Sequence, residues 1–293
     1  MHDSRKETFP LAAGDDRIKV VEHGLACDWG SWELVEATLR GFAIARDEYD
    51  AQLVTLISGQ DYPVVPLQDW ESKALASEGW IGLAEPLLYR TSWGRRRGEG
   101  DDRLTRYTFC WFRSPVESLR PVVPAWVRLP RFAARWWARA RAALSLRLEP
   151  VFGVRVVSRG RGVHYGFARM HNPFRGEPPW LGSQWLAVRR AELDLIMDSL
   201  RVGSTLRKVY RRSIIPDESA IVTALARGEL RSAMPPVSFF RWDVEKDTTV
   251  TWTIDDLDQI LASGSPFCRK VDLVESAELL DALDERSAPG VWS

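Results

Sequence analysis

The spacing of apolar residues in the first part of the chain predicts alternating strands and helices. Residues 18–21 form a short β-branched run that predicts a strand. Residues 32–49 repeat apolar side chains at helical spacing, and residues 52–57 form a continuous apolar run typical of a buried parallel strand. The run stops at the polar residues 58–63. Strand, helix, strand and polar loop is the order of a βαβ unit, in which ligands lie at the carboxyl ends of the strands.

The second half of the chain continues this mixed pattern. Apolar spacing predicts a helix over residues 186–200, extended by residues 206–212. Residues 213–218 have the form of a helix start, which residues 219–226 continue. The remaining predicted elements are a strand over residues 237–242, a helix over residues 255–262, a strand-like segment at residues 267–272 and a closing polar helix. We therefore predict one α/β domain over residues 1–293.

Two charged segments interrupt the pattern. Residues 92–105 combine glycines with charged side chains, which is typical of a mobile loop. Residues 128–147 form a basic stretch with Arg131, Arg135 and Arg139 spaced four apart, and this spacing predicts a helix. Such a helix either covers the core with a solvated outer face or makes a peripheral contact with an anionic membrane.

Composition narrows the classes of function. The 293 residues are 45% hydrophobic and balance 40 basic against 40 acidic side chains, which fits a folded protein and gives no footprint for nucleic acid. The cysteines Cys27, Cys110 and Cys268 have neither disulfide-framework nor metal-ligand spacing. No apolar run is long enough for a transmembrane helix, and the first residues are too polar for a secretory signal. We expect a cytoplasmic location, with the inner face of the membrane as a peripheral alternative.

Three short segments carry candidate chemistry. Pro216-Asp217-Glu218 begins a predicted helix, where acids act as caps, but a helix N-terminus also keeps a carboxylate ionised, as a general base must be. Asp61 follows a strand as a lone carboxylate, which is too little for a divalent metal site. Arg269-Lys270 is either a solvated basic pair or a partner for a diphosphate. The 14 tryptophans fit core packing and also the binding of sugar rings.

Taken together, these segments resemble the family of core-2/I-branching β-1,6-N-acetylglucosaminyltransferases and xylosyltransferases, in both order and spacing. The resemblance covers residues 2–272. The segments that carry it are Asp28-Trp29-Gly30-Ser31, Ser58-Gly59-Gln60-Asp61-Tyr62-Pro63, Gly182-Ser183-Gln184-Trp185, Pro216-Asp217-Glu218 and Phe267-Cys268-Arg269-Lys270-Val271-Asp272.

The resemblance implies a GT-A-like fold with a mostly parallel sheet, and an inverting transfer from a UDP-sugar to a hydroxyl acceptor with no metal and no cofactor. It implies a nucleotide-sugar-binding half over residues 2–90, variable loops and the basic helix over residues 91–180, and a catalytic and acceptor half over residues 181–275. Glu218 matches the family's catalytic base. The residues matched to the donor are Asp3, Asp61, Arg241, Arg269 and Lys270. The residues expected near the acceptor are Arg103, Gly182, Ser183, Trp185 and Asp217.

One departure from the family concerns the beginning of the chain. Family members open with a strand and a helix before a His-x-Asp segment, whose place is taken here by His2-Asp3. The first βα unit is therefore expected to be missing, either because the assigned start lies too far downstream or because the donor site is incomplete. The alternative to an enzyme is a non-catalytic relative that binds a sugar or a nucleotide.

Overall fold

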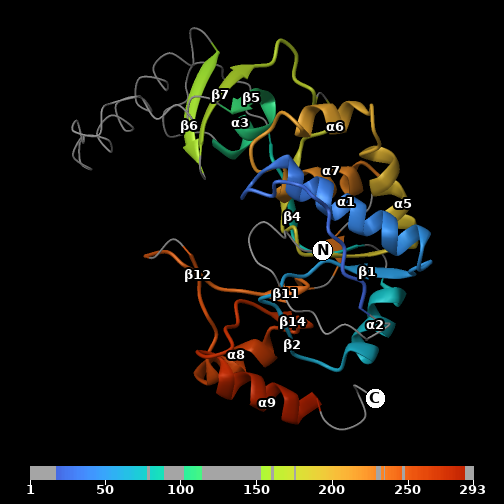
Figure 1. The fold of residues 1–293 in the computed structure, drawn as a ribbon, viewed down its shortest axis with the longest axis vertical. Coiled ribbons are helices and arrows are strands. Elements are labelled where there is room, and N and C mark those ends of the chain that lie inside the picture. The colour runs from blue at the N-terminus through green and yellow to red at the C-terminus, as the bar shows by residue number, and fades with distance from the viewer. Residues whose placement is uncertain are drawn as a thin grey trace. The chain divides into compact units, whose positions relative to one another are not determined.

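The structure is a computed structural model, and it describes residues 18–77, 80–88, 102–113, 153–159, 162–174, 176–228, 232–233, 235–245 and 248–287. The chain forms two compact units (Figure 1). Unit 1 comprises Met1–Arg40, Pro86–Trp180 and Leu200–Ala220, and unit 2 comprises Gly41–Glu85, Leu181–Ser199 and Ile221–Ser293. The chain crosses between the units five times: inside α1 (Trp32–Asp47), β4 (Ala84–Pro86), β8 (Trp180–Gly182) and α7 (Ala220–Arg227), and directly after α5 (Arg190–Ser199).

Unit 1 is built around an antiparallel sheet of order β5-β7-β6, formed by Phe109–Arg113, Gly162–Ala168 and Val154–Arg159. Side chains alternate between its two faces. The inner face buries Phe109 and Trp111 against Ile214 and Ile215, the residues just before Pro216. The unit's short helices are α3 (Asp102–Thr108), α6 (Thr205–Tyr210) and the 3₁₀ helix η2 (Pro216–Glu218).

Unit 2 contains a four-stranded and a three-stranded sheet. The first has the order β1-β9-β3-β10, formed by Leu53–Thr55, Ala187–Arg189, Trp80–Ile81 and Ser232–Ala233. The second has the order β11-β14-β2, formed by Ser238–Phe239, Phe267–Cys268 and Tyr62–Pro63. The helices of the unit are α2 (Leu67–Ala76), α5 (Arg190–Ser199), the 3₁₀ helix η3 (Ile254–Asp256), α8 (Leu257–Ala262) and α9 (Ala277–Ser287).

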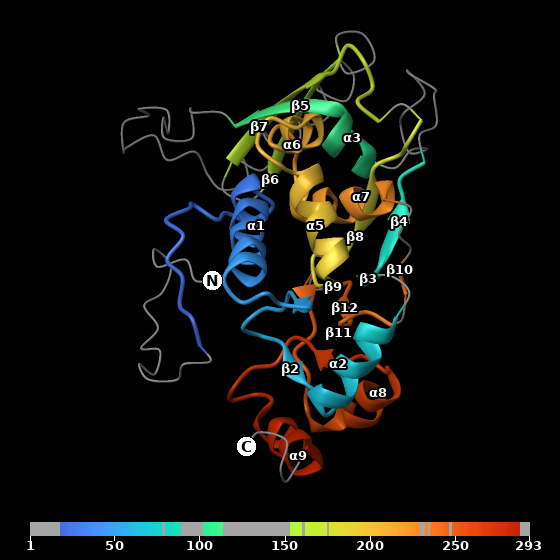
Figure 2. The ribbon, with the colours of Figure 1, turned by 90° about the vertical axis from the view of Figure 1, so that its right-hand side faces the viewer.

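Helices α8 and α9 pack against the three-stranded sheet of unit 2. They lie below β2 and β14 in Figure 1, and below β2 in Figure 2. One core cluster joins Ile260 of α8 and Leu279 of α9 to Cys268 of β14 and to Trp252, which has no exposed surface. The remaining small sheets are β12 (Trp242–Asp243) with β13 (Thr248–Thr249), and β4 (Ala84–Pro86) with β8 (Trp180–Gly182).

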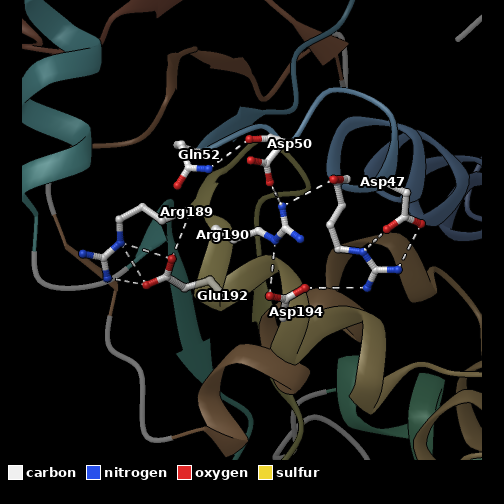
Figure 3. Close-up of polar contacts among 8 residues, drawn as sticks. Asp47, Asp50, Gln52, Arg189, Arg190, Glu192 and Asp194 are labelled. Carbon is white, nitrogen blue, oxygen red and sulfur yellow. Dashed lines mark hydrogen bonds and ion pairs between the residues drawn. The ribbon is translucent and has the colours of Figure 1, made fainter.

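An ion-pair network ties the start of α5 to the chain around β1 (Figure 3). The Arg190 guanidinium donates to Asp50 Oδ1 at 2.6 Å and to Asp194 Oδ2 at 3.3 Å. Beside it, the carboxylate of Glu192 has a 1% exposed side chain and accepts from the backbone N–H of Arg189 at 2.9 Å. Burial raises the pKa of Glu192, but the hydrogen bonds and charge of Arg189 outweigh it, so that the pKa is lowered overall.

Most predicted helices form close to their expected bounds, whereas several strand predictions are wrong. Residues 52–57 contain β1, which pairs antiparallel with β9 instead of forming a parallel strand. Residues 187–189, at the start of the predicted helix 186–200, form strand β9 instead. A turn at residues 201–204 separates α5 from α6. Residues 18–21 form no strand. The last residues of the predicted loop 92–105 belong to helix α3, which begins at Asp102.

The chain has the expected mixed α/β content, in small mixed and antiparallel sheets. Among the strands of the described ranges, β3–β10 and β11–β14 pair in parallel, and the other registered pairs are antiparallel. A mostly parallel central sheet is therefore not shown. The predicted basic helix 128–147, residues 92–101 of the predicted loop and His2-Asp3 lie outside the described residues.

Candidate functional site

The Pro216-Asp217-Glu218 turn is held by the backbone of Ile215, which precedes it. Ile215 has the left-handed values φ 52° and ψ 55°, an unfavourable conformation for a β-branched residue. Its N–H donates to Gly30 O at 3.1 Å, and its carbonyl accepts from Tyr107 Oη at 3.0 Å. Pro216 then fixes the first 3₁₀ position. Contacts from two other segments therefore impose the geometry that presents the two acids.

Gly30 explains why a Trp-Gly segment accompanies this turn. The residue has φ +65°, and a Cβ added there would lie 3.1 Å from Ile215 Cγ1. Both the backbone conformation and the close approach therefore favour glycine. The Asp28-Trp29-Gly30-Ser31 segment lies against the Pro216-Asp217-Glu218 turn, although the two are far apart in sequence.

Glu218 forms an ion pair with Arg106 of α3. The Arg106 Nη1 to Glu218 Oε2 distance is 2.9 Å, and the side chains are 16% and 39% exposed, respectively. Arg106 is anchored through its carbonyl, which accepts from the Ile214 N–H at 3.2 Å. A charge-assisted hydrogen bond to Oε2 orients the Glu218 carboxylate. The half-exposed carboxylate remains in reach of a bound molecule.

Asp217 lies in a different environment from its neighbour. Its Oδ1 atom is buried and has no hydrogen-bond partner among the residues that the structure describes. Burial, and then the negative charge of Glu218, raise the pKa of Asp217 to about 7. A large fraction of Asp217 is therefore a neutral carboxylic acid at neutral pH and can donate a hydrogen bond. The two adjacent acids thus lie in different environments, with Glu218 paired to Arg106 and Asp217 buried.

Arg103, predicted to lie near the acceptor, is on α3 three residues before Arg106 and is half-buried. Residues three apart are neighbours on a helix surface. Arg103, Arg106, Asp217 and Glu218 all belong to unit 1. Arg106 and Tyr107 were not predicted as part of the site, because their contacts are made across 112 and 108 residues of sequence, respectively.

The predicted donor-binding residues gather at one edge of the three-stranded sheet in unit 2. Strands β11 and β14 are parallel, and β2 runs antiparallel to β14. The carboxyl ends of β11 and β14 therefore lie at the same edge as the start of β2. Asp61 directly precedes β2, Arg269-Lys270 directly follows β14, and Arg241 lies two residues after β11.

Asp61 organises the loop that carries it. Its Oδ2 accepts from the Ser58 backbone N–H at 2.6 Å and from Ser58 Oγ at 2.5 Å. Its Oδ1 accepts from Ser238 Oγ on β11. Both carboxylate oxygens are thus engaged within the protein, so Asp61 fastens the loop to the sheet. Ser58 and Ser238 were missed, because a serine in a polar loop or a strand gives no distinctive signal.

Arg269 is a cation with incomplete hydrogen bonding. Its guanidinium carbon lies 4.5 Å from the centroid of the Trp185 ring. Its Nε atom is buried and finds no hydrogen-bond partner in the described part of the chain. Burial lowers the pKa of Arg269, and the negative charge of Asp61 opposes that shift. Lys270, the next residue, is half-buried, and its backbone N–H donates to Val250 O at 3.3 Å.

The Gly182-Ser183-Gln184-Trp185 segment positions Trp185. A Cβ at Gly182 would lie 2.1 Å from Leu83 O, so glycine permits the close approach of the two backbones. The Ser183 N–H donates to that same carbonyl at 3.0 Å. Ser183 Oγ in turn accepts from the Trp185 N–H at 3.0 Å, which fixes the turn. Ser183 and Gly182 therefore support the ring that covers Arg269.

Arg241 has different contacts from Arg269. Its guanidinium donates to Gln259 Oε1 at 2.8 Å and to Asp256 Oδ1 at 3.1 Å. It also lies 4.9 Å from the centroid of the Trp252 ring. The side chain is exposed but its charge is already paired, so these contacts tie the segment after β11 to η3 and α8.

The structure thus brings Asp61, Trp185, Arg241, Arg269 and Lys270 together in unit 2 and leaves Asp217 and Glu218 in unit 1. Asp3 lies outside the described residues. Within the described ranges, no group of three or more His, Cys, Asp or Glu side chains could hold a metal ion. No helix in these ranges has the length and apolar character needed to cross a bilayer.

Comparisons with known proteins add no assignment to this geometry. A scan against models of protein families found no match, and a search of curated proteins found no matching sequence. The resemblance to the core-2/I-branching transferases therefore stays a prediction from the motifs.

Proposed function

We propose that the chain is an inverting, metal-independent glycosyltransferase with a GT-A-like fold. It moves a sugar of the GlcNAc or xylose type from a UDP-sugar to a hydroxyl acceptor, such as a carbohydrate. Glu218 is the general base, and Arg269 and Lys270 neutralise the diphosphate. The mixed α/β content is compatible with this fold, and the resemblance to the family rests on the five motifs.

The observation that carries the proposal is the state of Arg269. A buried N–H without a hydrogen-bond partner costs free energy, about 1–3 kcal/mol for a neutral group and more for a charged one. Such a group is stabilised when a bound anion accepts from it. The Trp185 ring shields one face of the guanidinium, and the adjacent Lys270 adds a second cation. Two adjacent cations suit a diphosphate, whose negative charge increases as it leaves.

The proposed reaction is a single displacement. The acceptor oxygen attacks the anomeric carbon while the Glu218 carboxylate takes the acceptor's hydroxyl proton. The bond between the anomeric carbon and the diphosphate oxygen breaks, and its electron pair stays on that oxygen. Arg269 and Lys270 stabilise the resulting charge, so no metal ion is needed. The ion pair with Arg106 orients the Glu218 carboxylate for the proton transfer.

The test is a donor screen with the full chain. UDP-GlcNAc, UDP-xylose, UDP-glucose and UDP-galactose are each incubated with and without a panel of sugar acceptors, and the release of UDP is measured. We expect release with at least one donor, and Glu218→Gln should abolish most of it. Glu278→Gln on the exposed surface of α9 is the matched control and should leave it unchanged.

A second candidate is a non-catalytic relative that binds a nucleotide or a sugar. The observation that favours it is the Arg106 ion pair, because this contact already engages one oxygen of the Glu218 carboxylate. Calorimetry with UDP separates the two functions. Binding of UDP without turnover of any donor would support the binding protein. No binding of UDP would contradict both the transferase and a nucleotide-binding relative.

A further inference from the structure

The outer face of the β5-β7-β6 sheet in unit 1 exposes a group of aromatic side chains. Phe112 on β5 is 41% exposed, and Tyr165 and Phe167 on β7 are 37% and 48% exposed. Phe112 is directly opposite Tyr165 in the sheet register. Tyr165 and Phe167 are two residues apart on one strand, so all three rings are on the same face. We call these three residues the aromatic face.

The aromatic face is a packed surface. The rings of Phe112 and Phe167 meet edge to face, with their centroids 6.0 Å apart. Val154 and Val156 of β6 lie opposite Phe167 and Tyr165, respectively, so they extend the same apolar face. Contiguous exposed aromatic side chains on a sheet mark an interaction surface more often than scattered single ones do.

Positive charge borders the aromatic face. The Arg212 guanidinium carbon lies 4.9 Å from the centroid of the Phe112 ring, and the Arg212 carbonyl accepts from the N–H of Trp111 in β5. Arg211 and Arg212 are both exposed. Aromatic rings next to arginines suit the boundary between lipid headgroups and acyl chains, where rings enter the apolar layer and cations meet phosphates.

The sequence between β5 and β6 gives the same sign of charge. Residues 114–152 leave from one strand of this sheet and return to another. They contain seven basic residues and two acidic ones, so their formal charge is 7 − 2 = +5. The basic residues are Arg120, Arg128, Arg131, Arg135, Arg139, Arg141 and Arg147, and the acidic ones are Glu117 and Glu149. An anionic partner surface is therefore favoured over a neutral one.

We propose that the aromatic face docks the protein on an anionic lipid bilayer, with Phe112, Tyr165 and Phe167 entering the interface and Arg212 meeting lipid phosphates. This inference uses none of the residues assigned to sugar transfer. It stands or falls independently of the proposed reaction, because vesicle binding needs neither donor nor acceptor.

The first experiment is sedimentation of the full chain with vesicles. Vesicles of phosphatidylcholine with about one third phosphatidylglycerol are compared with pure phosphatidylcholine, because anionic lipid attracts basic residues near the surface. We expect binding to the anionic vesicles, little binding to neutral ones, and release by added salt. The absence of binding to anionic vesicles, or equal binding to both kinds, overturns the proposal.

The variants test the named residues. Tyr165→Ser with Phe167→Ser should lower the partition coefficient for anionic vesicles by about tenfold or more, because two rings no longer enter the interface. The matched control is Leu273→Ser with Val274→Ser, where both residues are 84% exposed in unit 2. It removes apolar area elsewhere and should leave binding unchanged. Equal binding by both double variants overturns the assignment of the aromatic face.

A second measurement covers the case in which the face variant does not fold. Hydroxyl-radical labelling of the unmodified chain reports the accessibility of Phe112, Tyr165 and Phe167 by mass spectrometry. We expect all three to be labelled in solution and protected by anionic vesicles. Protection without vesicles at every protein concentration would show that residues 114–152 cover the face, and protection that grows with concentration would indicate a second copy. Either outcome overturns the proposal.

Discussion

The charged groups of Glu218 and Arg269 differ in whether the protein itself supplies their hydrogen-bond partner. In unit 1 the carboxylate of Glu218 already has its cation, Arg106, at 2.9 Å. In unit 2 the Nε atom of Arg269 is buried and has no hydrogen-bond partner in the described ranges. The carboxylate of nearby Asp61 instead accepts hydrogen bonds from Ser58 and Ser238. Glu218 therefore has its partner within the protein, whereas Arg269 Nε can still donate to a bound molecule.

Arg241 provides an internal control for this comparison. Both arginines lie at the same edge of the sheet, and each packs on a tryptophan ring, 4.9 Å away for Arg241 and 4.5 Å for Arg269. Within the described ranges, of the two only Arg241 also has a carboxylate and an amide at hydrogen-bond distance. A basic residue next to an aromatic ring therefore does not by itself indicate a ligand site. The unmet hydrogen-bonding capacity of Arg269 is what distinguishes the two.

The largest expected effect is on Glu218. Glu218→Gln keeps the side-chain volume but cannot accept the acceptor proton, and general-base catalysis contributes about 10²–10⁴-fold. We expect kcat for sugar transfer to fall by that factor while UDP affinity, measured by calorimetry, changes little. If Glu218 only completes the ion pair with Arg106, the variant should lose less than about 1 kcal/mol of stability and keep its turnover. A stable variant with normal kcat would end the base assignment.

The next effect compares Arg269 with Arg241. A hydrogen bond to a charged group contributes about 1.5–3 kcal/mol, so Arg269→Met should weaken UDP binding about tenfold to hundredfold. Arg241→Met should leave UDP binding unchanged and lower the free energy of unfolding by about 0.2–1 kcal/mol, through the lost surface pair with Asp256. Calorimetry and chemical denaturation of both variants measure the two quantities. Equal losses of UDP affinity would show that the comparison misidentifies the anion site.

Two glycines give a smaller effect, on stability. Gly182→Ala places a Cβ 2.1 Å from the Leu83 carbonyl oxygen, while Gly30→Ala places one 3.1 Å from Ile215 Cγ1 at φ +65°. Strain of this kind costs about 1–3 kcal/mol per residue. We expect both variants to unfold at lower denaturant, Gly182→Ala more so because it meets backbone. Gly24→Ala is the control, since it has a similar φ of +64° but no atom within 4 Å of its added Cβ.

Local patterns predicted much of the fold, because they depend on neighbouring residues. The helix expected over residues 32–49 is α1, Trp32–Asp47, and the acids after Pro216 do begin a 3₁₀ turn before α7. The apolar run at residues 52–57 revealed a strand but not its direction, since the antiparallel pairing of β1 is set by β9, more than 130 residues later.

The candidate residues were identified from motifs, but their contacts were not. Four of the donor-side residues meet at one sheet edge only because β11, β14 and β2 have a particular order and direction. The pairing of Glu218 with Arg106 likewise depends on how α3 packs, and this packing cannot be predicted from the spacing of residues in the sequence. Sequence therefore indicated candidate side chains, and tertiary structure determined which of them already have hydrogen-bond partners among the described residues.

The last expected effect concerns Asp217, the neighbour of Glu218, and the pH dependence of stability. Its pKa is raised from 3.8 to about 7, first by burial and then by the charge of Glu218. The unfolded chain loses this proton near pH 4, whereas the folded chain keeps it until about pH 7. The stabilisation is therefore fully present below pH 4 and is lost as pH rises through 7.

Denaturation of the wild type between pH 4 and pH 8 should show this falling contribution, and Asp217→Asn, which has no proton to lose, should not. The double variant Asp217→Asn with Glu218→Gln sharpens the test by removing both titrating groups. An identical pH dependence in wild type and Asp217→Asn would show that burial does not raise the pKa of Asp217.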